Sequence, residues 1–267
     1  MNSIISFFVD LNPVIQAFIA TLFTWGMTTL GAAIVFFFKK TNRNLMDAML
    51  GISAGVMIAA SFWSLLAPSI EMAENLGMIP WLVASTSFMA GGLLLFIGDK
   101  IYTKLEQKSK KKGHKKRSIM LLLSITLHNI PEGLAIGVAF GSIIYGLSGA
   151  TILSACILAL GIGLQNFPEG SAVSLPLRRE GYSRIKSFLL GSLSGIVEPI
   201  SAIIGAILVI KVQTFLPYCL AFAAGAMIYV VVEELIPESQ SNKRKDLMAL
   251  FTLIGFSIMM ILDVALG

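Results

Sequence analysis

Two near-copies of one hexapeptide hold the side chains best suited to bind a metal ion. Residues 128–133 read His-Asn-Ile-Pro-Glu-Gly and residues 165–170 read Gln-Asn-Phe-Pro-Glu-Gly, each inside a long apolar run. In both copies the first residue lies four positions and the asparagine three positions before the glutamate, so all three share one helix face. The proline removes a backbone hydrogen bond, which predicts a kink with a free carbonyl oxygen. Imidazole, carboxylate and amide groups at two kinks indicate a divalent-cation site.

Three carboxylates are expected deep in one hydrocarbon core. Glu132 and Glu169 belong to the two copies, and Glu198 precedes a proline in a later apolar run. Unpaired ionised carboxylates are very costly in such surroundings. No lysine or arginine is predicted at comparable depth, so protons or metal ions must balance the charge. Mixed oxygen and nitrogen ligands favour zinc, iron(II), manganese or cadmium, and the lack of thiolates argues against a closed structural site.

The composition is that of a polytopic membrane protein. The 267 residues are 56% hydrophobic and 13% charged, and the mean hydropathy is +0.83; a soluble domain is about a quarter charged. The net charge of +5 lies in short loops and does not indicate a nucleic-acid partner. Cys156 and Cys219 lie in apolar runs and are interpreted as core residues. Because the N-terminus lacks a basic segment, no cleaved signal peptide is expected.

Eight apolar runs are long enough to cross a bilayer, for which about 20 residues suffice. All but Lys211 of the 20 basic residues fall in the odd-numbered loops. The positive-inside rule places those loops in the cytoplasm and both termini outside, with the plasma membrane as the default location. The predicted spans are 11–38, 45–68, 79–101, 119–141, 148–176, 185–210, 214–236 and 247–266.

A short internal repeat predicts how the spans are arranged. Residues 54–58 read Ala-Gly-Val-Met-Ile in span 2, and residues 224–228 read Ala-Gly-Ala-Met-Ile in span 7, which crosses in the opposite direction. This indicates an all-α membrane protein with a 3+2+3 inverted repeat, forming a single transporter domain over residues 1–267. The lysine-rich third loop, 103–118, is expected to be disordered and cytoplasmic.

The acidic residues near the ends of the second and seventh spans each allow two interpretations. Glu233 and Glu234 at the inner end of span 7 form either a cytoplasmic exit for cations or an interfacial acidic cap. Glu71 in the outward second loop either attracts cations at the outer mouth or is an ordinary surface charge. Asp263, near the outer end of span 8, is expected at the membrane interface.

The paired motifs resemble the ZIP family of metal transporters, in its GufA-like branch, and the resemblance covers the whole chain. It implies uptake of zinc and related divalent metals into the cytosol, with elevator-like sliding of a transport bundle. It also implies a two-metal site. The first metal would be held by His128, Glu132, Gln165 and Glu169 with Met57 alongside; the second would share Glu132 and Glu169 and add Asn129, Asn166 and Glu198.

Two departures from the family pattern concern the second motif. Many relatives have aspartate where this chain has Asn166, and others have histidine where it has Gln165. The second metal position therefore loses a negative charge, and we expect weaker occupancy there. The third loop is rich in lysine rather than histidine, so metal sensing by that loop is not expected.

The sequence thus predicts a transporter rather than an enzyme, with Zn²⁺ as the main substrate and Fe²⁺, Mn²⁺ and Cd²⁺ as related ones. No resident cofactor is expected. The partners are divalent ions and the lipid bilayer; dimers occur in the family, and the sequence leaves the oligomeric state open. Two alternatives remain at this point: a membrane-embedded zinc hydrolase, for which a catalytic zinc needs three protein ligands and an open water position, and a static metal sensor.

Overall fold

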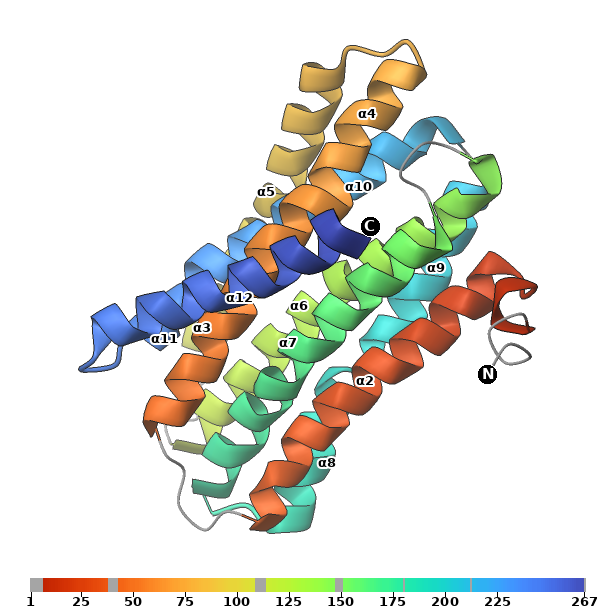
Figure 1. The fold of residues 1–267 in the computed structure, drawn as a ribbon. Coiled ribbons are helices and arrows are strands. Elements are labelled where there is room, and N and C mark those ends of the chain that lie inside the picture. Colours follow the sequence, from red (N-terminus) through yellow and green to blue (C-terminus); the bar gives the residue numbers. More distant parts are fainter. Residues whose placement is uncertain are drawn as a thin grey trace.

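A computed structural model describes residues 7–37, 43–108, 114–146, 151–179, 181–211 and 213–266; within these, the side chains of 102–103, 105–125, 127–128, 179, 213 and 266 lie outside the description. No strand occurs in the described ranges, and long helices run side by side in one bundle (Figure 1). The helices are α2 Pro13–Phe37, α3 Arg43–Ala60, α4 Ala67–Asn75, α5 Pro80–Lys108, α6 His114–Ser142, α7 Ile152–Arg179, α8 Arg184–Ser194, α9 Val197–Lys211, α10 Leu216–Val230, α11 Ile236–Gln240 and α12 Lys245–Leu266, with π-helices η1 Ser61–Leu66 and η4 Val231–Leu235 and short 3₁₀ turns η2 Ile143–Tyr145 and η3 Gln213–Phe215.

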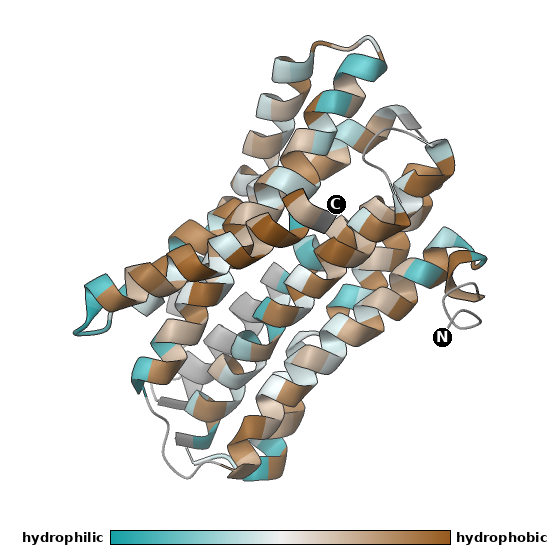
Figure 2. Ribbon diagram, viewed as in Figure 1, coloured by the Kyte–Doolittle hydropathy of each residue, from teal (hydrophilic) through white to brown (hydrophobic). Residues whose placement is uncertain are grey.

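Seven helical segments of the described chain are long and apolar enough to cross a membrane, and each coincides with a predicted span. They are Pro13–Phe37, Arg43–Asn75, Pro80–Ile101, Ile152–Arg178, Arg184–Lys211, Leu216–Gln240 and Lys245–Ala265. Apolar residues follow the length of these segments, and hydrophilic ones gather at several of their ends (Figure 2). The remaining predicted span, 119–141, falls in α6, where the apolar segment found is the shorter Asn129–Tyr145.

Two predicted boundaries differ from the structure. The second span continues as one helical segment to Asn75 rather than ending near residue 68; the wider turn of the π-helix η1 lies directly before Pro68, which removes one backbone hydrogen bond there. The predicted disordered loop 103–118 is shorter: α5 continues to Lys108 and α6 begins at His114. Lysine, glutamate and glutamine are good helix formers, so helices extend into this charged segment. Residues 109–113 lie outside the described ranges.

Four pairs of helices make the most extensive contacts. The helix α2 packs on α7 and α6 packs on α9, while α3 packs on α12 and α10 packs on α5. Further contacts join α3 to α7 and α10 to α6. The second and fifth predicted spans lie at the centre, since 61% of the apolar window is buried in both Arg43–Asn75 and Ile152–Arg178. Only 17% is buried in Lys245–Ala265, so this helix has most of its surface on the outside of the bundle.

The repeated Ala-Gly-x-Met-Ile segment has the same local structure in both places. The π-helix η1 begins four residues after Met57, and η4 begins four residues after Met227. The repeat glycines also have equivalent surroundings. A Cβ on Gly55 would overlap the Thr252 carbonyl oxygen of α12, and a Cβ on Gly225 would overlap the Phe88 carbonyl oxygen of α5. Glycine at these crossings lets the paired backbones touch.

Candidate metal site

Seven of the predicted ligands, on four helices, are buried in the bundle. His128 belongs to α6, but its side chain lies outside the described set. For the other predicted ligands the exposed fraction of the residue does not exceed 4%. They are Met57 on α3, Asn129 and Glu132 on α6, Gln165, Asn166 and Glu169 on α7, and Glu198 on α9. Both α6 and α7 continue as helices through Pro131 and Pro168, so the ligands of each motif remain on one helix.

The two motifs contact each other through Glu132 and Gln165. The Gln165 amide Nε2 donates a hydrogen bond of 2.6 Å to Glu132 Oε1. The other carboxylate oxygen, Glu132 Oε2, and the amide oxygen Gln165 Oε1 are buried and have no hydrogen-bond partner among the described residues. Buried oxygens are normally paired, so two unpaired acceptors at this contact are suited to a cation.

A break in the sixth predicted span positions Glu198. The helix α8 ends at Ser194 and α9 begins at Val197, and the Glu198 backbone N–H donates to the Gly195 carbonyl oxygen at 3.1 Å. Pro199 is tolerated there because it stands in the first helical turn. The positive end of the helix dipole favours a carboxylate in this turn. In the sequence, Gly195 and Pro199 indicate a break, whereas the apolar pattern predicts one uninterrupted span over 185–210.

Hydrogen bonds from two other helices satisfy the Glu198 carboxylate. Asn166 Nδ2 on α7 lies 2.9 Å from both Glu198 Oε1 and Glu198 Oε2. Thr24 Oγ1 on α2 also donates to Glu198 Oε2, and the Thr24 carbonyl oxygen accepts from Asn166 Nδ2 at 3.3 Å. Sequence reasoning missed Thr24. The detectable signal was the buried series Thr21, Thr24 and Thr28, whose spacing of three and four residues puts three hydroxyls on one helix face.

The amide N–H groups of the two asparagines donate to different acceptors. Asn129 Nδ2 donates to the backbone carbonyl oxygen of Ser194 at 2.9 Å, whereas Asn166 donates to Glu198. Both amide oxygens, Asn129 Oδ1 and Asn166 Oδ1, are buried without a partner in the part of the chain that is described. Together with Glu132 Oε2 and Gln165 Oε1 they give four unpaired oxygens on α6 and α7.

The motif glycines hold α6 and α7 against the helices that complete the site. A Cβ on Gly133 would overlap the backbone of Glu198, and a Cβ on Gly170 would overlap the Thr28 carbonyl oxygen. Ser53 Oγ on α3 donates to the Gln165 carbonyl oxygen at 3.3 Å. Because Met57 is one turn beyond Ser53, this bond places Met57 on the side of α3 that faces α7.

The three carboxylates lie within electrostatic range of one another. Glu132 interacts with Glu169 and Glu198, and Glu169 interacts also with Glu234. Among the described residues, none of the three forms an ion pair with lysine or arginine. No group of three His, Cys, Asp or Glu side chains able to hold a metal occurs within the described set either. The donors that the structure brings together are therefore carboxylates combined with amides.

Comparison with known proteins identifies the family. Residues 11–118 and 103–263 match the sequence profile described as ZIP zinc transporter. The chain belongs to the ZIP zinc transporter family. It is similar to zinc transporter ZIP11 of Xenopus tropicalis, with 40% identity over 96% of this chain and 98% of the relative, and to zinc transporter ZIP11 of Homo sapiens, with 38% identity over the same shares. It is 33% identical to zinc transporter GufA of Myxococcus xanthus, over 93% of this chain and 98% of that protein. Membership confirms a metal ion transporter rather than an enzyme.

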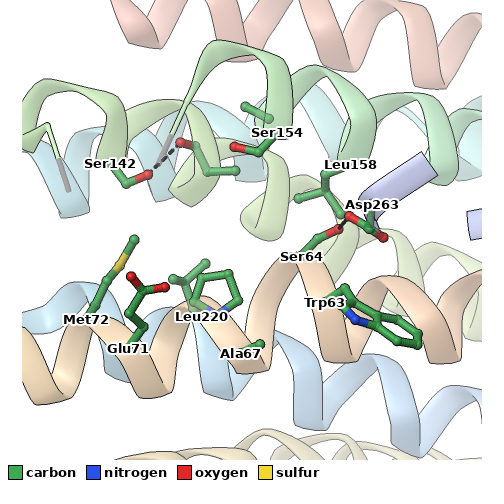
Figure 3. A pocket seen from close by; sticks show the side chains of 13 residues that line it. Trp63, Ser64, Ala67, Glu71, Met72, Ser142, Ser154, Leu158, Leu220 and Asp263 are labelled. Carbon is green, nitrogen blue, oxygen red and sulfur yellow. Dashed lines mark hydrogen bonds between the residues drawn. The ribbon is translucent and has the colours of Figure 1, made fainter. Parts of the chain in front are cut away.

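The remaining acidic residues of this ZIP family member contribute none of the four unpaired oxygens of Asn129, Glu132, Gln165 and Asn166, which are called the four-oxygen cluster from here on. Glu71 is exposed on α4, and Glu233 is exposed on η4. Glu234 is half-buried and interacts electrostatically with Glu169. Asp263, expected at the membrane interface, is partly buried and accepts a 2.6 Å hydrogen bond from Ser64 (Figure 3).

Proposed function

We propose that this protein carries zinc, and with it iron(II), manganese and cadmium, into the cytoplasm by alternating access through a two-metal site on α6, α7 and α9. The observation that carries the proposal is the set of four buried oxygens without hydrogen-bond partners among the described residues. They belong to Asn129, Glu132, Gln165 and Asn166 and lie on the two helices that also bring Glu132 and Glu169 together. Carboxylate and amide oxygens bind divalent cations, and the imidazole of His128 in the first motif shifts the preference towards borderline ions such as zinc.

The first metal position centres on Glu132 and Gln165. Gln165 Nε2 donates to Glu132 Oε1, so the amide N–H occupies a direction from which a cation would approach. A half-turn of the Gln165 amide exchanges its nitrogen for the oxygen Oε1, and the carboxylate and the amide oxygen then face the same ion. His128, Glu169 and Met57 complete this position in the proposal.

The second metal position adds Asn129, Asn166 and Glu198 and shares Glu132 and Glu169. A cation there must displace the Asn166 N–H from both oxygens of Glu198. Hydrogen bonds to a charged group contribute about 1.5–3 kcal/mol each, so this competition weakens binding. We therefore infer that the second ion binds more weakly and more transiently than the first.

Eight spans with an inverted 3+2+3 repeat account for the arrangement of helices. The 29 residues of α6 have a length of about 43 Å at 1.5 Å per residue, which exceeds a hydrocarbon core of about 30 Å. The repeat relates span 1 to span 6, span 2 to span 7, span 3 to span 8 and span 4 to span 5. Under this relation the α2–α7 pair (spans 1 and 5) corresponds to the α9–α6 pair (spans 6 and 4). The α3–α12 pair (spans 2 and 8) corresponds to the α10–α5 pair (spans 7 and 3). All four of these helix pairs are among the most extensive contacts in the bundle.

The basic loops give the proposal its direction. With the odd-numbered loops in the cytoplasm and the protein in the plasma membrane, the termini and Glu71 face the outside of the cell. Glu233 and Glu234 then face the cytoplasm. Metal then passes from the Glu71 side to the four-oxygen cluster and leaves towards Glu234. The helices α2, α6, α7, α8 and α9 form one packing group, and α3, α4, α5, α10, α11 and α12 form the other; relative movement of the two groups would open the site alternately.

Metal flux into liposomes tests the function. The purified chain is reconstituted, and uptake of Zn²⁺, Fe²⁺, Mn²⁺ and Cd²⁺ is followed with and without a pH gradient. Saturable uptake of zinc with competition from the other ions is expected. Tight zinc binding with slow exchange and no flux would support a static sensor, and peptide or lipid hydrolysis without flux would support a hydrolase; either result would overturn the proposal.

A further inference from the structure

Two carbonyl oxygens at the end of α8 receive hydrogen bonds from other helices. A helix leaves its last carbonyl oxygens without partners inside the helix. Trp25 Nε1 on α2 donates to the Ser192 carbonyl oxygen at 2.8 Å, and Asn129 Nδ2 on α6 donates to the Ser194 carbonyl oxygen at 2.9 Å. The end of α8 is therefore bound to α2 and α6 just before the chain turns into α9 and reaches Glu198.

One stretch of α2 contacts both sides of this break. Thr24 donates to the Glu198 carboxylate on α9, while the next residue, Trp25, binds the Ser192 carbonyl oxygen on α8. One turn further along α2, the Thr29 hydroxyl lies 2.7 Å from the Ser192 hydroxyl and forms a hydrogen bond with it. Because α2 holds both halves of the broken span, it sets how α9 starts relative to the end of α8.

Gly195, in the break itself, has no room for a side chain. A Cβ there would lie 2.9 Å from Glu198 Oε1, 3.0 Å from Trp25 Cδ1 and 3.1 Å from Thr28 Oγ1. Ordinary contacts between carbon atoms are about 3.5–4.0 Å. The φ angle of Gly195 is −86°, which any residue adopts, so lack of space and not backbone conformation calls for glycine. The Glu198 carboxylate thus lies directly against the backbone of the break.

The Glu198 carboxylate cannot easily move away from this contact. Its two oxygens accept hydrogen bonds from Asn166 on α7, and one of them also accepts from Thr24 on α2. On the remaining side, a Cβ on Gly133 of α6 would overlap the Glu198 backbone. The residue is fully buried. A group added at Gly195 would therefore displace the carboxylate from its hydrogen bonds instead of finding free space.

We propose that Trp25 and Gly195 are positioning residues for the second metal position. The Trp25 indole N–H fixes the end of α8, and the bare backbone of Gly195 leaves the space that the Glu198 carboxylate occupies. Neither residue contacts the metal; both act through Glu198. Residues that orient a metal ligand in this way typically change metal affinity 10–100-fold when replaced. The effect on metal rests on the proposed two-metal function, whereas the steric link between Gly195 and Glu198 does not.

Zinc titration of the purified full chain tests the positioning role. The variants are Trp25→Phe, which keeps an aromatic ring but removes the N–H, and Gly195→Ala. The matched controls are Trp81→Phe, at a residue that is 71% exposed, and Gly26→Ala, next to Trp25, where a Cβ would meet nothing within 4 Å. Isothermal titration should show affinity for the second zinc about tenfold weaker in both variants. Affinity for the first zinc should stay within about twofold, and the controls should match the wild type.

Two results of this titration would overturn the proposal. Equal weakening of both zinc affinities would indicate general damage to the bundle, and unchanged affinities in both variants would remove any positioning role. Trp25→Phe tests the role even if Gly195→Ala fails to fold. Zinc flux by the wild type together with unchanged affinities would leave the proposed function in place and remove only this inference.

Thermal unfolding without metal tests the steric link separately from transport. Gly195→Ala should lower the melting temperature of the otherwise unchanged chain, and should lower it much less in a Glu198→Ala background, where the carboxylate that its Cβ meets is absent. Such a difference would support the link even if the wild type showed no zinc flux. An equal loss in both backgrounds would show that the added Cβ is opposed by Trp25 and Thr28 instead, and would overturn the role of Gly195.

Discussion

The two Pro-Glu-Gly motifs are nearly identical in sequence but differ in what their amides bind. Asn129 on α6 directs its amide N–H to a backbone carbonyl oxygen, whereas Asn166 on α7 directs its N–H to both oxygens of the Glu198 carboxylate. Glu132 accepts from Gln165 of the other motif and retains a buried oxygen without a partner among the described residues. Glu169 lies in electrostatic range of Glu198 and Glu234, towards the proposed exit.

Duplication of the motif therefore sets the positions of the ligands, while the hydrogen-bond partners of each ligand decide whether it is available to a metal. The first motif offers a carboxylate oxygen that nothing else in the described chain uses. In the second motif, Asn166 donates its amide N–H to Glu198, which also accepts a hydrogen bond from Thr24 of the first span. We therefore expect substitutions that look equivalent in the two motifs to have unequal effects.

The largest effect is expected when either motif loses its carboxylate. Glu132→Gln and Glu169→Gln should each weaken zinc binding about 100-fold or more, as for removal of one partner from a buried charge contact, about 3 kcal/mol. Glu132→Gln should be the more severe, because Glu132 is fully buried while Glu169 is 4% exposed. Competition with a chelating dye measures the zinc affinity of each variant, with Glu74→Gln, at an exposed acid on α4, as the control. Normal affinity in Glu169→Gln would confine the metal to the first motif.

Thr24→Val should have the next largest effect, because it removes a hydroxyl donor to Glu198 and preserves side-chain shape. A hydrogen bond to a charged group contributes about 1.5–3 kcal/mol, so transport efficiency should fall roughly tenfold or more. Thr21→Val is the matched control: Thr21 is equally buried, and its hydroxyl bonds to carbonyl oxygens of its own helix. Equal uptake by the two variants would remove Thr24 from the site.

Asparagine-to-aspartate changes test the asymmetry between the motifs directly. Asn166→Asp adds a charged ligand at the second metal position and should tighten binding of a second zinc about tenfold, since ligand charge tunes metal affinity. Asn129→Asp also adds a charge at that position, but it leaves the Ser194 backbone carbonyl oxygen without its N–H donor and should therefore also destabilise the fold by about 1–3 kcal/mol. Isothermal titration and thermal unfolding measure the two effects. An unchanged second-site affinity in Asn166→Asp would contradict the asymmetry.

The smallest effect is expected from Met57→Leu, which replaces a thioether at nearly constant volume. Met227 is its counterpart in the repeat and is as deeply buried, so Met227→Leu controls for packing. Met57→Leu alone should weaken cadmium uptake about threefold and manganese uptake much less, because sulfur ligands favour softer metals. Equal effects of both variants on both metals would reduce Met57 to a packing residue.

The sequence predicted those features that depend on local pattern. Apolar length located seven spans that the structure confirms, and the motif spacing placed Glu132 and Asn129 on one buried helix. Thr24, by contrast, lies 142 residues from Asn166 inside an ordinary apolar run, and threonine is common in membrane helices. Its role depends on the packing of α2 against α7, which no local pattern specifies.

The π-helices and the cavity lined by η1, α4 and α12 lie beyond sequence reasoning for a similar reason. The repeat showed that Met57 and Met227 are related, but the wider helical turn after each depends on tertiary contacts. The sequence predicts Asp263 at the membrane interface because it lies near the outer end of the eighth predicted span. Only the approach of η1 to α12 brings it to Ser64 and turns an apparent surface charge into part of a cavity.

One side-by-side measurement tests whether zinc passes through the four-oxygen cluster. Wild-type protein, His128→Ala and Glu132→Ala are reconstituted in equal amount into liposomes that contain a zinc-sensing dye, after each is shown to be folded. We predict saturable zinc uptake by the wild type and none above empty liposomes for either variant. Full uptake by both variants would contradict the assignment of the transport site.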